Sequence, residues 1–273
     1  MKTIIVPIDF SEQAANALKV AASLAKRHGS EILVLHMLEL NQAIISSTEG
    51  FYQEHTVFLL KLAEKRMKEF LAKPYLEGLK VTPIIKHFKV FGELNEIAEK
   101  HKADLVVMGS HGTDGLKEIF IGSNAEKVVR HSNIPVLVIK DEISDFKVTD
   151  FVFASDFQKE NIRAFNKARE FAKKLNARFH LVYINTPGDE FLSDQDIHTR
   201  VAEFQKEANS GIEVEIYNDY TVERGVLNFS ENINADVIGI PTHGRKGLSH
   251  FFMGSIGEDV ANHSTIPVIT FKL

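Results

Sequence analysis

The sequence has 273 residues, with 37 acidic and 32 basic side chains and a formal net charge of −5. Because domains usually contain about 100–200 residues, this length predicts two domains with two modest cores. The acidic balance argues against a non-specific nucleic-acid binder, and the absence of cysteine excludes disulfides, thiolate metal sites and cysteine nucleophiles. No stretch reaches the ~18 apolar residues of a membrane span, so we expect a soluble, cytoplasmic protein that does not bind membranes.

The first half of the chain alternates short apolar runs with longer segments of helical period. Runs rich in Ile, Val and Leu predict strands at 3–8, 31–38, 81–88, 104–108 and 135–139. Helical stripes are expected around 14–25, 57–71, 92–101 and 124–132. Strands with little alternation are typical of a parallel sheet whose two faces are both covered by helices.

The second half repeats this order. Strands are predicted near 151–155, 178–184, 213–217, 236–240 and 267–271, with helices near 161–175, 194–209, 223–233 and 256–263. The segment 140–145 is short and mostly charged, and it marks the boundary between a first domain at 1–143 and a second at 144–273.

The two halves are copies of one another. Residues 104–140 align on 236–272 without a gap, with sixteen identities that include Asp104 and Asp236, while 3–36 align on 150–183 with six that include Asp9 and Asp156. The sequence therefore predicts an α/β protein with two doubly wound, five-stranded parallel-sheet domains of the Rossmann-like type, related by internal duplication.

A glycine loop follows the fourth predicted strand of the first copy. It has the spacing G-x2-G-x9-G-S, with Gly109, Gly112, Gly122 and Ser123 at the fixed positions. Ligands of open parallel sheets bind beyond the carboxyl ends of the strands, glycines allow close backbone approach, and a helix N-terminus favours phosphate oxygens. The loop is neither a Walker motif nor G-x-G-x-x-G.

Purely structural interpretations stay open at these positions. Ser123 with Glu126 forms an S-x-x-E capping box, and the glycines would also serve as ordinary turn residues. Asp9 lies just past the first strand, where its carboxylate would accept a hydrogen bond from a ribose hydroxyl or help hold a cation. Together with Glu12, it would also cap a helix.

These segments together resemble the universal stress protein family, closely in the first copy and more loosely in the second. The resemblance rests on Val6-Pro7-Ile8-Asp9-Phe10-Ser11, Leu33-Val34-Leu35-His36-Met37, Val107-Met108-Gly109-Ser110-His111-Gly112, Gly122-Ser123 and Ile134-Pro135-Val136-Leu137-Val138. It implies an adenine-nucleotide-binding fold and a tandem member of that family.

The resemblance also implies a site for ATP, or for ADP or AMP. Adenine and ribose would lie beside Pro7, Ile8 and Asp9, with Asp9 taking a ribose hydroxyl, the Met37 backbone reading the adenine edge, and Met108 and Gly109 lining the ribose side. The phosphates, with Mg²⁺ or Mn²⁺ between them, would contact His111, Gly112, Gly122, Ser123 and Asn124.

The second copy departs from this pattern. Ala154, Ser155, Pro241 and Ile256 replace Pro7, Ile8, Gly109 and Asn124, although Asp156, Gly244, Gly254 and Ser255 are kept. Proline at the first glycine position removes an N–H donor, so we expect a degenerate second site.

In the family that the chain resembles, domains pair through their last strands. Segments 134–140 and 266–272 would then pair antiparallel within one chain; alternatively, the two domains would meet through some other surface. A homodimer and an unknown protein partner are further hypotheses.

No catalytic residue is assigned, because no nucleophile–base pair is recognisable. The twelve histidines show no metal-ligand spacing on any helix, so no protein-only metal site is predicted. The first hypothesis is a nucleotide-binding stress-response switch, the second a nucleotide-free scaffold, and the third a slow ATP hydrolase.

Overall fold

The structure is a computed structural model that describes residues 1–38, 50–87, 90–110, 122–188, 191–242 and 256–273. The chain forms two compact units, Met1–Leu116 with Ile139–Phe146, and Lys117–Val138 with Lys147–Leu273. The division does not follow the copies, since α5 (Ser123–His131) and most of β5 (Val136–Ile139) belong to the second unit.

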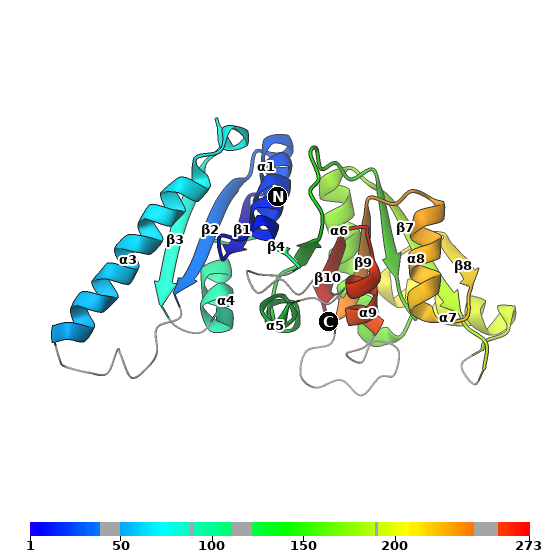
Figure 1. Ribbon diagram of the computed structural model, residues 1–273. Coiled ribbons are helices and arrows are strands. Elements are labelled where there is room, and N and C mark those ends of the chain that lie inside the picture. Colours follow the sequence, from blue (N-terminus) through cyan, green and yellow to red (C-terminus); the bar gives the residue numbers. More distant parts are fainter. Residues whose placement is uncertain (39–49, 88–89, 111–121, 189–190, 243–255) are drawn as a thin grey trace. The chain divides into compact units, whose positions relative to one another are not determined.

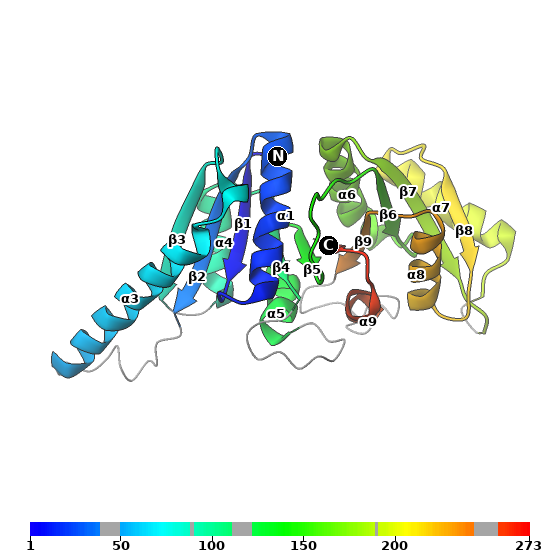
Figure 2. The ribbon, with the colours of Figure 1, turned by 45° about the horizontal axis from the view of Figure 1, so that its top comes forward.

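The described part of the first unit contains four parallel strands in the order β3-β2-β1-β4. Its strands are β1 (Thr3–Ile8), β2 (Glu31–Leu38), β3 (Val81–His87) and β4 (Leu105–Gly109). Its helices are α1 (Glu12–His28), α3 (Gly50–Leu71) and α4 (Val90–Lys100), with a short 3₁₀ turn at Pro74–Leu76. Helices α1 and α3 lie on one side of these strands and α4 on the other (Figures 1 and 2).

Helix α1 shows how local sequence sets the bounds of an element. The Ser11 hydroxyl accepts from the Ala14 N–H at 3.1 Å, and Gly29 ends the helix with a φ of 65°. Glycine adopts this left-handed conformation without steric cost. Between these caps, small and aliphatic side chains at helical spacing pack against the sheet: Ala14, Ala17, Leu18, Ala21, Leu24 and Ala25 are all buried.

The second unit has the strand order β5-β10-β9-β6-β7-β8. Beyond β5, its strands are β6 (Asp150–Ala154), β7 (Arg178–Asn185), β8 (Val214–Asn218), β9 (Val237–Thr242) and β10 (Val268–Lys272). Its helices, besides α5, are α6 (Ile162–Leu175), α7 (Asp194–Ala208), α8 (Val222–Asn232) and α9 (Ile256–His263), with a 3₁₀ turn at Lys159–Asn161. The five strands of the second copy are parallel.

Strand β5 joins this sheet antiparallel to β10, with Val138 opposite Val268 and Val136 opposite Thr270. This is the pairing expected for the two last strands. It closes one edge of β10, which would otherwise present unpaired backbone groups.

The two faces of β6 pack against different layers. Val152 and Ala154 belong to a core shared with Val226 and Phe229 of α8. The alternating residues Phe151 and Phe153 point to the opposite face, where aromatic rings gather with centroids 5.3–6.2 Å apart, as expected for edge-to-face and offset pairs. That aromatic cluster comprises Phe151, Phe153, Phe165, Phe179, Phe204 and Phe271.

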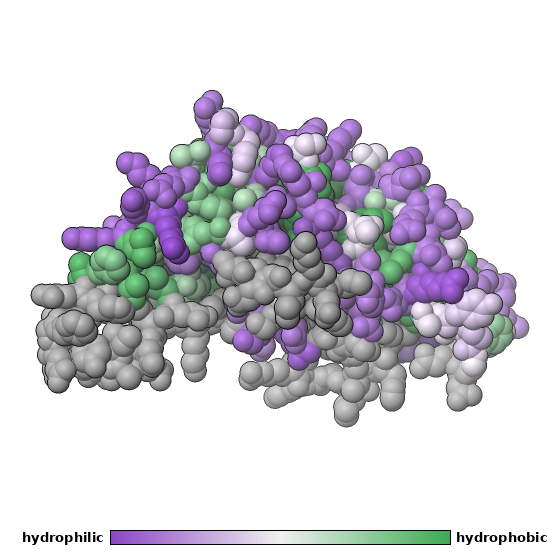
Figure 3. Space-filling view, viewed as in Figure 1, coloured by the Kyte–Doolittle hydropathy of each residue, from purple (hydrophilic) through white to green (hydrophobic). Residues whose placement is uncertain are grey.

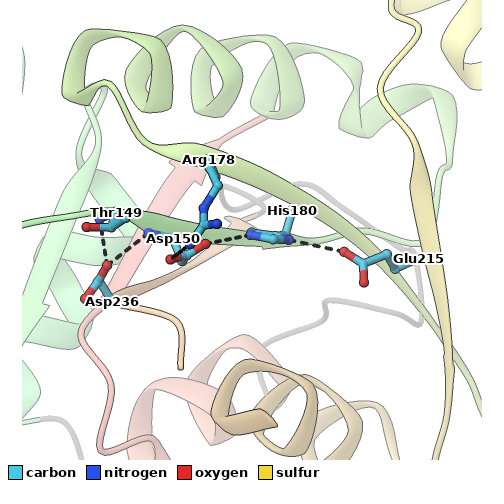
Figure 4. A network of polar contacts seen from close by, with 6 residues as sticks. All are labelled: Thr149, Asp150, Arg178, His180, Glu215 and Asp236. Atoms are coloured by element: carbon cyan, nitrogen blue, oxygen red, sulfur yellow. Dashed lines mark hydrogen bonds and ion pairs between the residues drawn. The ribbon is translucent and has the colours of Figure 1, made fainter. Parts of the chain in front are cut away.

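In each copy, an aspartate side chain accepts hydrogen bonds from backbone N–H groups at the start of the central strand. Asp104 Oδ2 accepts from the Lys2 N–H at 2.6 Å and the Thr3 N–H at 3.3 Å. Asp236 Oδ2 accepts from the Thr149 and Asp150 N–H groups at 2.6 and 2.9 Å (Figure 4). The aspartate identity that revealed the repeat therefore has a structural role.

Asp150, whose N–H bonds to Asp236, also takes part in a network of side-chain contacts within the second unit. Asp150 lies 2.6 Å from Arg178 and 2.9 Å from His180 Nε2, and His180 Nδ1 lies 3.2 Å from Glu215 (Figure 4). Burial favours the neutral Asp150 carboxyl, but hydrogen bonds from Arg178 and His180 outweigh this and hold its pKa below its usual value. These side-chain contacts link β6, β7 and the edge strand β8.

The expected fold class, a mostly parallel α/β sheet in a duplicated chain, is confirmed. The predicted end of the third strand at Phe88 lies outside the described residues. Within the described part of the chain, no helix combines the length and the apolar character that crossing a membrane requires.

Replacing Asp236 by Ala will lower the free energy of unfolding by about 1–3 kcal/mol, because two backbone N–H groups lose a charged acceptor. The measurement is urea-induced unfolding followed by circular dichroism. Asp236→Asn keeps one acceptor oxygen and will lose less. Equal losses in both variants would show that the hydrogen bonds do not stabilise the strand.

Candidate functional site

The carboxyl ends of β1, β2 and β4 form one edge of the first unit, because these strands are parallel neighbours. Pro7 and Ile8 end β1, Met37 lies at the end of β2, and Met108 and Gly109 end β4. The structure thus places these five predicted site residues at the same edge. Met108 is buried, whereas Pro7 and Met37 are half-buried.

Asp9 forms a tight turn directly after β1. Its Oδ1 accepts from the Ser11 N–H at 3.0 Å, and Phe10 between them has a φ of 67°. A left-handed conformation in a bulky residue is uncommon and strained, and such strain persists where the surroundings enforce it. The alternative role of Asp9 as helix cap is wrong, because Ser11 occupies the N-cap of α1. The Asp9 side chain is half-buried at the edge of the sheet.

His36 also lies at this edge, although its place in the sequence predicted no role for it in the site. Its Nδ1–H donates to the Ile8 carbonyl at 2.9 Å, and its ring lies 4.4 Å from the Phe10 ring. Burial is the largest effect on its pKa and lowers it, against the opposing effects of the Ile8 hydrogen bond and the Asp9 charge. A neutral His36 therefore supports the strained turn that carries Asp9.

Gly109 is required by a contact within the chain. A Cβ atom at this position would lie 2.8 Å from three atoms of Gln13, including its backbone carbonyl carbon and oxygen. The close approach that a glycine permits here is therefore that of helix α1 to the end of β4. The role predicted for Gly109 beside a ribose remains a prediction.

The N-terminus of α5, in the second unit, carries the later part of the glycine loop. The Gly122 carbonyl accepts the first helical hydrogen bond, from the Glu126 N–H at 3.0 Å. Gly122 is thus the N-cap and Ser123 the first helical residue, so the interpretation of Ser123 and Glu126 as a capping box is wrong. The exposed Asn124 follows in the first turn, where N–H groups have no partner inside the helix.

His111 and Gly112 lie outside the described residues, as do Gly244, Gly254 and Ser255 of the second copy. Their predicted contacts with phosphates remain predictions.

Comparison with known proteins identifies the family. The model of the universal stress protein family matches residues 1–140 and again 148–272. The chain belongs to the universal stress protein family.

Two relatives from Methanocaldococcus jannaschii each match about half of the chain. Universal stress protein MJ0531 is 33% identical over 146 residues, which cover 51% of this chain and 82% of the relative. Universal stress protein MJ0577 is 33% identical over 153 residues, covering 51% of this chain and 94% of the relative. A solved universal stress protein from Archaeoglobus fulgidus has a TM-score of 0.69 at 25% identity and covers 99% of this chain and 96% of its own.

The second universal stress protein domain keeps the aspartate turn, but there the aspartate is buried and hydrogen-bonded within the domain. Asp156 is 3% exposed, and its Oδ1 accepts from the Gln158 N–H at 2.9 Å and from Asn161 Nδ2 at 2.5 Å. Phe157 repeats the left-handed conformation with a φ of 58°. Burial, its largest influence, raises the pKa of Asp156. Asn161 stands where the first copy has Ala14.

Among the described residues, no group of three or more His, Asp or Glu side chains is placed to hold a metal ion.

Lowering the pH will reduce stability in a way that depends on His36. A histidine with a depressed pKa is protonated in the unfolded chain first, so its contribution is complete above about pH 6.5 and is lost as the pH falls below it. Thermal unfolding between pH 7.5 and 5 will show a shallower decline in His36→Asn than in the wild type. His198→Asn, on the exposed part of α7, is the control for removing a surface histidine. Parallel declines in the wild type and His36→Asn would contradict the assignment.

Gly109→Ala will destabilise the protein by about 1–3 kcal/mol, because the added methyl group forces α1 away from β4. Gly211→Ala is the matched control, since nothing lies within 4 Å of a Cβ at that exposed position. Chemical denaturation of both variants measures the difference. Equal stability would show that α1 adjusts without cost.

Proposed function

We propose that residues 1–143 bind an adenine nucleotide and that the protein acts as a nucleotide-dependent switch in a stress response of the cytoplasm. Residues 144–273 serve as a degenerate second copy with a structural or regulatory role. The proposed ligand is ATP, or ADP or AMP, together with Mg²⁺ or Mn²⁺. Membership of the universal stress protein family and the resemblance of the first-copy motifs support this proposal.

The observation that carries the proposal is the difference between the two aspartate turns. Asp9 lies half-buried at the carboxyl edge with the small side chain of Ala14 beside the turn, whereas Asp156 is buried and bonded to Asn161. A carboxylate that reaches the surface of the sheet edge can accept hydrogen bonds from sugar hydroxyls. The buried Asp156 carboxylate, which already accepts from Asn161, has less capacity to accept such bonds.

The resemblance of the first-copy motifs to the family supports each proposed contact. Asp9 would accept from a ribose hydroxyl, the Met37 backbone would bond to the adenine edge, and Pro7, Ile8, Met108 and Gly109 would border adenine and ribose. His111, Gly112, Gly122, Ser123 and Asn124 would contact phosphates. The α5 N-terminus fits an anion, because its first N–H groups lack helical partners and its dipole favours negative charge.

The acidic net charge of −5 is compatible with this ligand. Phosphates held by backbone N–H groups and a cation do not require a basic surface. The cation would neutralise phosphate charge when bound, while Asp9 and the backbone groups of the chain would orient the nucleotide.

Two other functions remain as alternatives. A nucleotide-free scaffold would use the same glycines as turns and would carry no small molecule. A slow ATP hydrolase would need a residue that positions water for attack on the terminal phosphate, and its activity would disappear in a variant that still binds ATP.

Adenine nucleotide will raise the melting temperature of the wild-type protein, because a ligand at a hundredfold excess over its Kd stabilises the folded state by about 2.7 kcal/mol. Asp9→Ala will reduce or abolish this shift, and Asp156→Ala, measured against its own melting temperature, will retain it. Ala14→Asn, which introduces the amide found in the second copy, will weaken binding in the same way as Asp9→Ala.

Mass spectrometry of small molecules released by denaturing the purified protein identifies the nucleotide. A melting temperature unchanged by ATP, ADP and AMP, with or without Mg²⁺ and Mn²⁺, would exclude the switch and favour the scaffold. Multiple turnovers of ATP that Asp9→Ala loses while still binding would favour the hydrolase.

A further inference from the structure

A polar cavity lies at the amino ends of β1, β2 and β3, on the edge of the first unit opposite to the one that carries Asp9. Its volume is about 670 Å³, within the range of about 300–1,000 Å³ that small-molecule sites occupy. The arrows of β2 and β3 in Figure 1 point away from this edge, and hydrophilic residues predominate along it in Figure 3. Helix α1 has 17 residues and is about 26 Å long, so the cavity at its end is well separated from the Asp9 turn at its start.

Three stretches of the chain line the cavity, and the structure describes all of the lining residues. The stretches are the start of β1 with Lys2, the end of α1 with Lys26, and the turn before β3 with Lys80. Gly29 and Gly78 also line it, and an added Cβ at either glycine would meet no heavy atom within 4 Å. The cavity is therefore open at both glycines.

The three lysines bring positive charge to the cavity from separate parts of the chain. Lys80 forms an ion pair with Glu31 at 2.5 Å, and the Thr3 hydroxyl donates to the same carboxylate at 3.2 Å. The ammonium groups of Lys2 and Lys26 form no ion pair or hydrogen bond with any residue that the structure describes. These two groups are available to an anion, whereas Lys80 offsets the charge of Glu31.

Two titratable groups at this edge indicate a positive potential. The hydrogen bond from Lys80 has the largest effect on the pKa of Glu31 and lowers it, and the charges of Lys80 and His101 act in the same direction. Burial lowers the pKa of His28, and the N-terminal ammonium group and Arg27 lower it further. Nearby cations thus favour the charged form of an acid and the neutral form of a base, although the whole chain carries a net charge of −5.

The second copy does not repeat this arrangement. At the offset that aligns the first strands of the two copies, Thr149 stands in the place of Lys2, and Asp150 in the place of Thr3. Asp150 contributes a carboxylate to the network of Figure 4, whereas Thr3 is uncharged. The lysine-lined cavity is therefore a property of the first copy and is not required by the fold.

We propose that this cavity binds a small soluble anion that carries a phosphate or diphosphate group, at a site separate from that of the nucleotide. The ammonium groups of Lys2 and Lys26 bond to the phosphate oxygens, because charge-assisted hydrogen bonds are stronger than neutral ones. The exposed Glu77 also lines the cavity, and its charge opposes the anion and limits the affinity. The proposal does not depend on nucleotide binding by residues 1–143.

Isothermal titration calorimetry with inorganic diphosphate tests the proposal on the full-length protein. The wild type will bind diphosphate, and Lys2→Gln and Lys26→Gln will each raise the dissociation constant about 5–10-fold, because each removes a charge-assisted hydrogen bond. Glu77→Gln will lower the constant, because it removes the opposing charge. Lys206→Gln is the matched control and will leave the constant unchanged, since Lys206 is also an exposed lysine in the last turn of a helix but belongs to the second unit.

Amide NMR signals locate the bound diphosphate. Binding will shift the signals of Gly29 and Gly78, and the Lys2→Gln, Lys26→Gln double variant will lose these shifts. The melting temperature of each variant without ligand verifies that the fold is retained.

Three results would overturn the proposal. The first is a wild type that does not bind diphosphate at millimolar concentration. The second is an affinity that neither lysine substitution changes. The third is a set of NMR shifts confined to Gly122 and Ser123, which would assign the diphosphate to the N-terminus of α5 instead.

Discussion

The structure depends on keeping a fully buried strand at the centre of each copy. Ile4, Ile5 and Val6 of β1 and Phe151, Val152 and Phe153 of β6 are all 0% exposed. Such a strand gains apolar burial on both faces, but its backbone must leave the sheet at both ends without unpaired polar groups. The chain solves this with one aspartate at each end. Asp104 or Asp236 accepts from the first N–H groups, and Asp9 or Asp156 turns the backbone away after the last residue.

Much of this architecture could be predicted from the sequence, because buried parallel strands appear as apolar runs and duplication appears as matching residues. What could not be predicted depends on distances between segments. Gly109 has the same sequence signal whether a ligand or a helix approaches it, and the structure places Gln13 there. The caps at Ser11 and Gly122 were misplaced, because several polar residues near a helix start fit the same pattern. His36 gave no signal beyond its position near a strand end, since its importance comes from contacts with Ile8 and Phe10.

The two aspartate turns show how one motif can diverge in role. Both retain a strained phenylalanine, which costs conformational energy in each copy. In the second copy Asn161 stabilises the buried carboxylate, yet its own Oδ1 lacks a hydrogen-bond partner among the described residues. The second turn has thus become part of a packed interior with an imperfect polar network, while the first remains at the surface of the sheet edge.

The pairing of β5 with β10 has a consequence for how the chain can be divided. From the sequence, the charged segment 140–145 resembles a linker at which the two domains could be separated. However, β5 precedes this segment and contributes an edge strand to the sheet of the second unit. A fragment that begins after this segment would expose Val268, Ile269 and Thr270 as an unprotected strand edge, which invites pairing between molecules. Fission of the gene at the sequence repeat would thus yield a half-chain prone to aggregation, so the duplication is held together by folding as well as by a peptide linker.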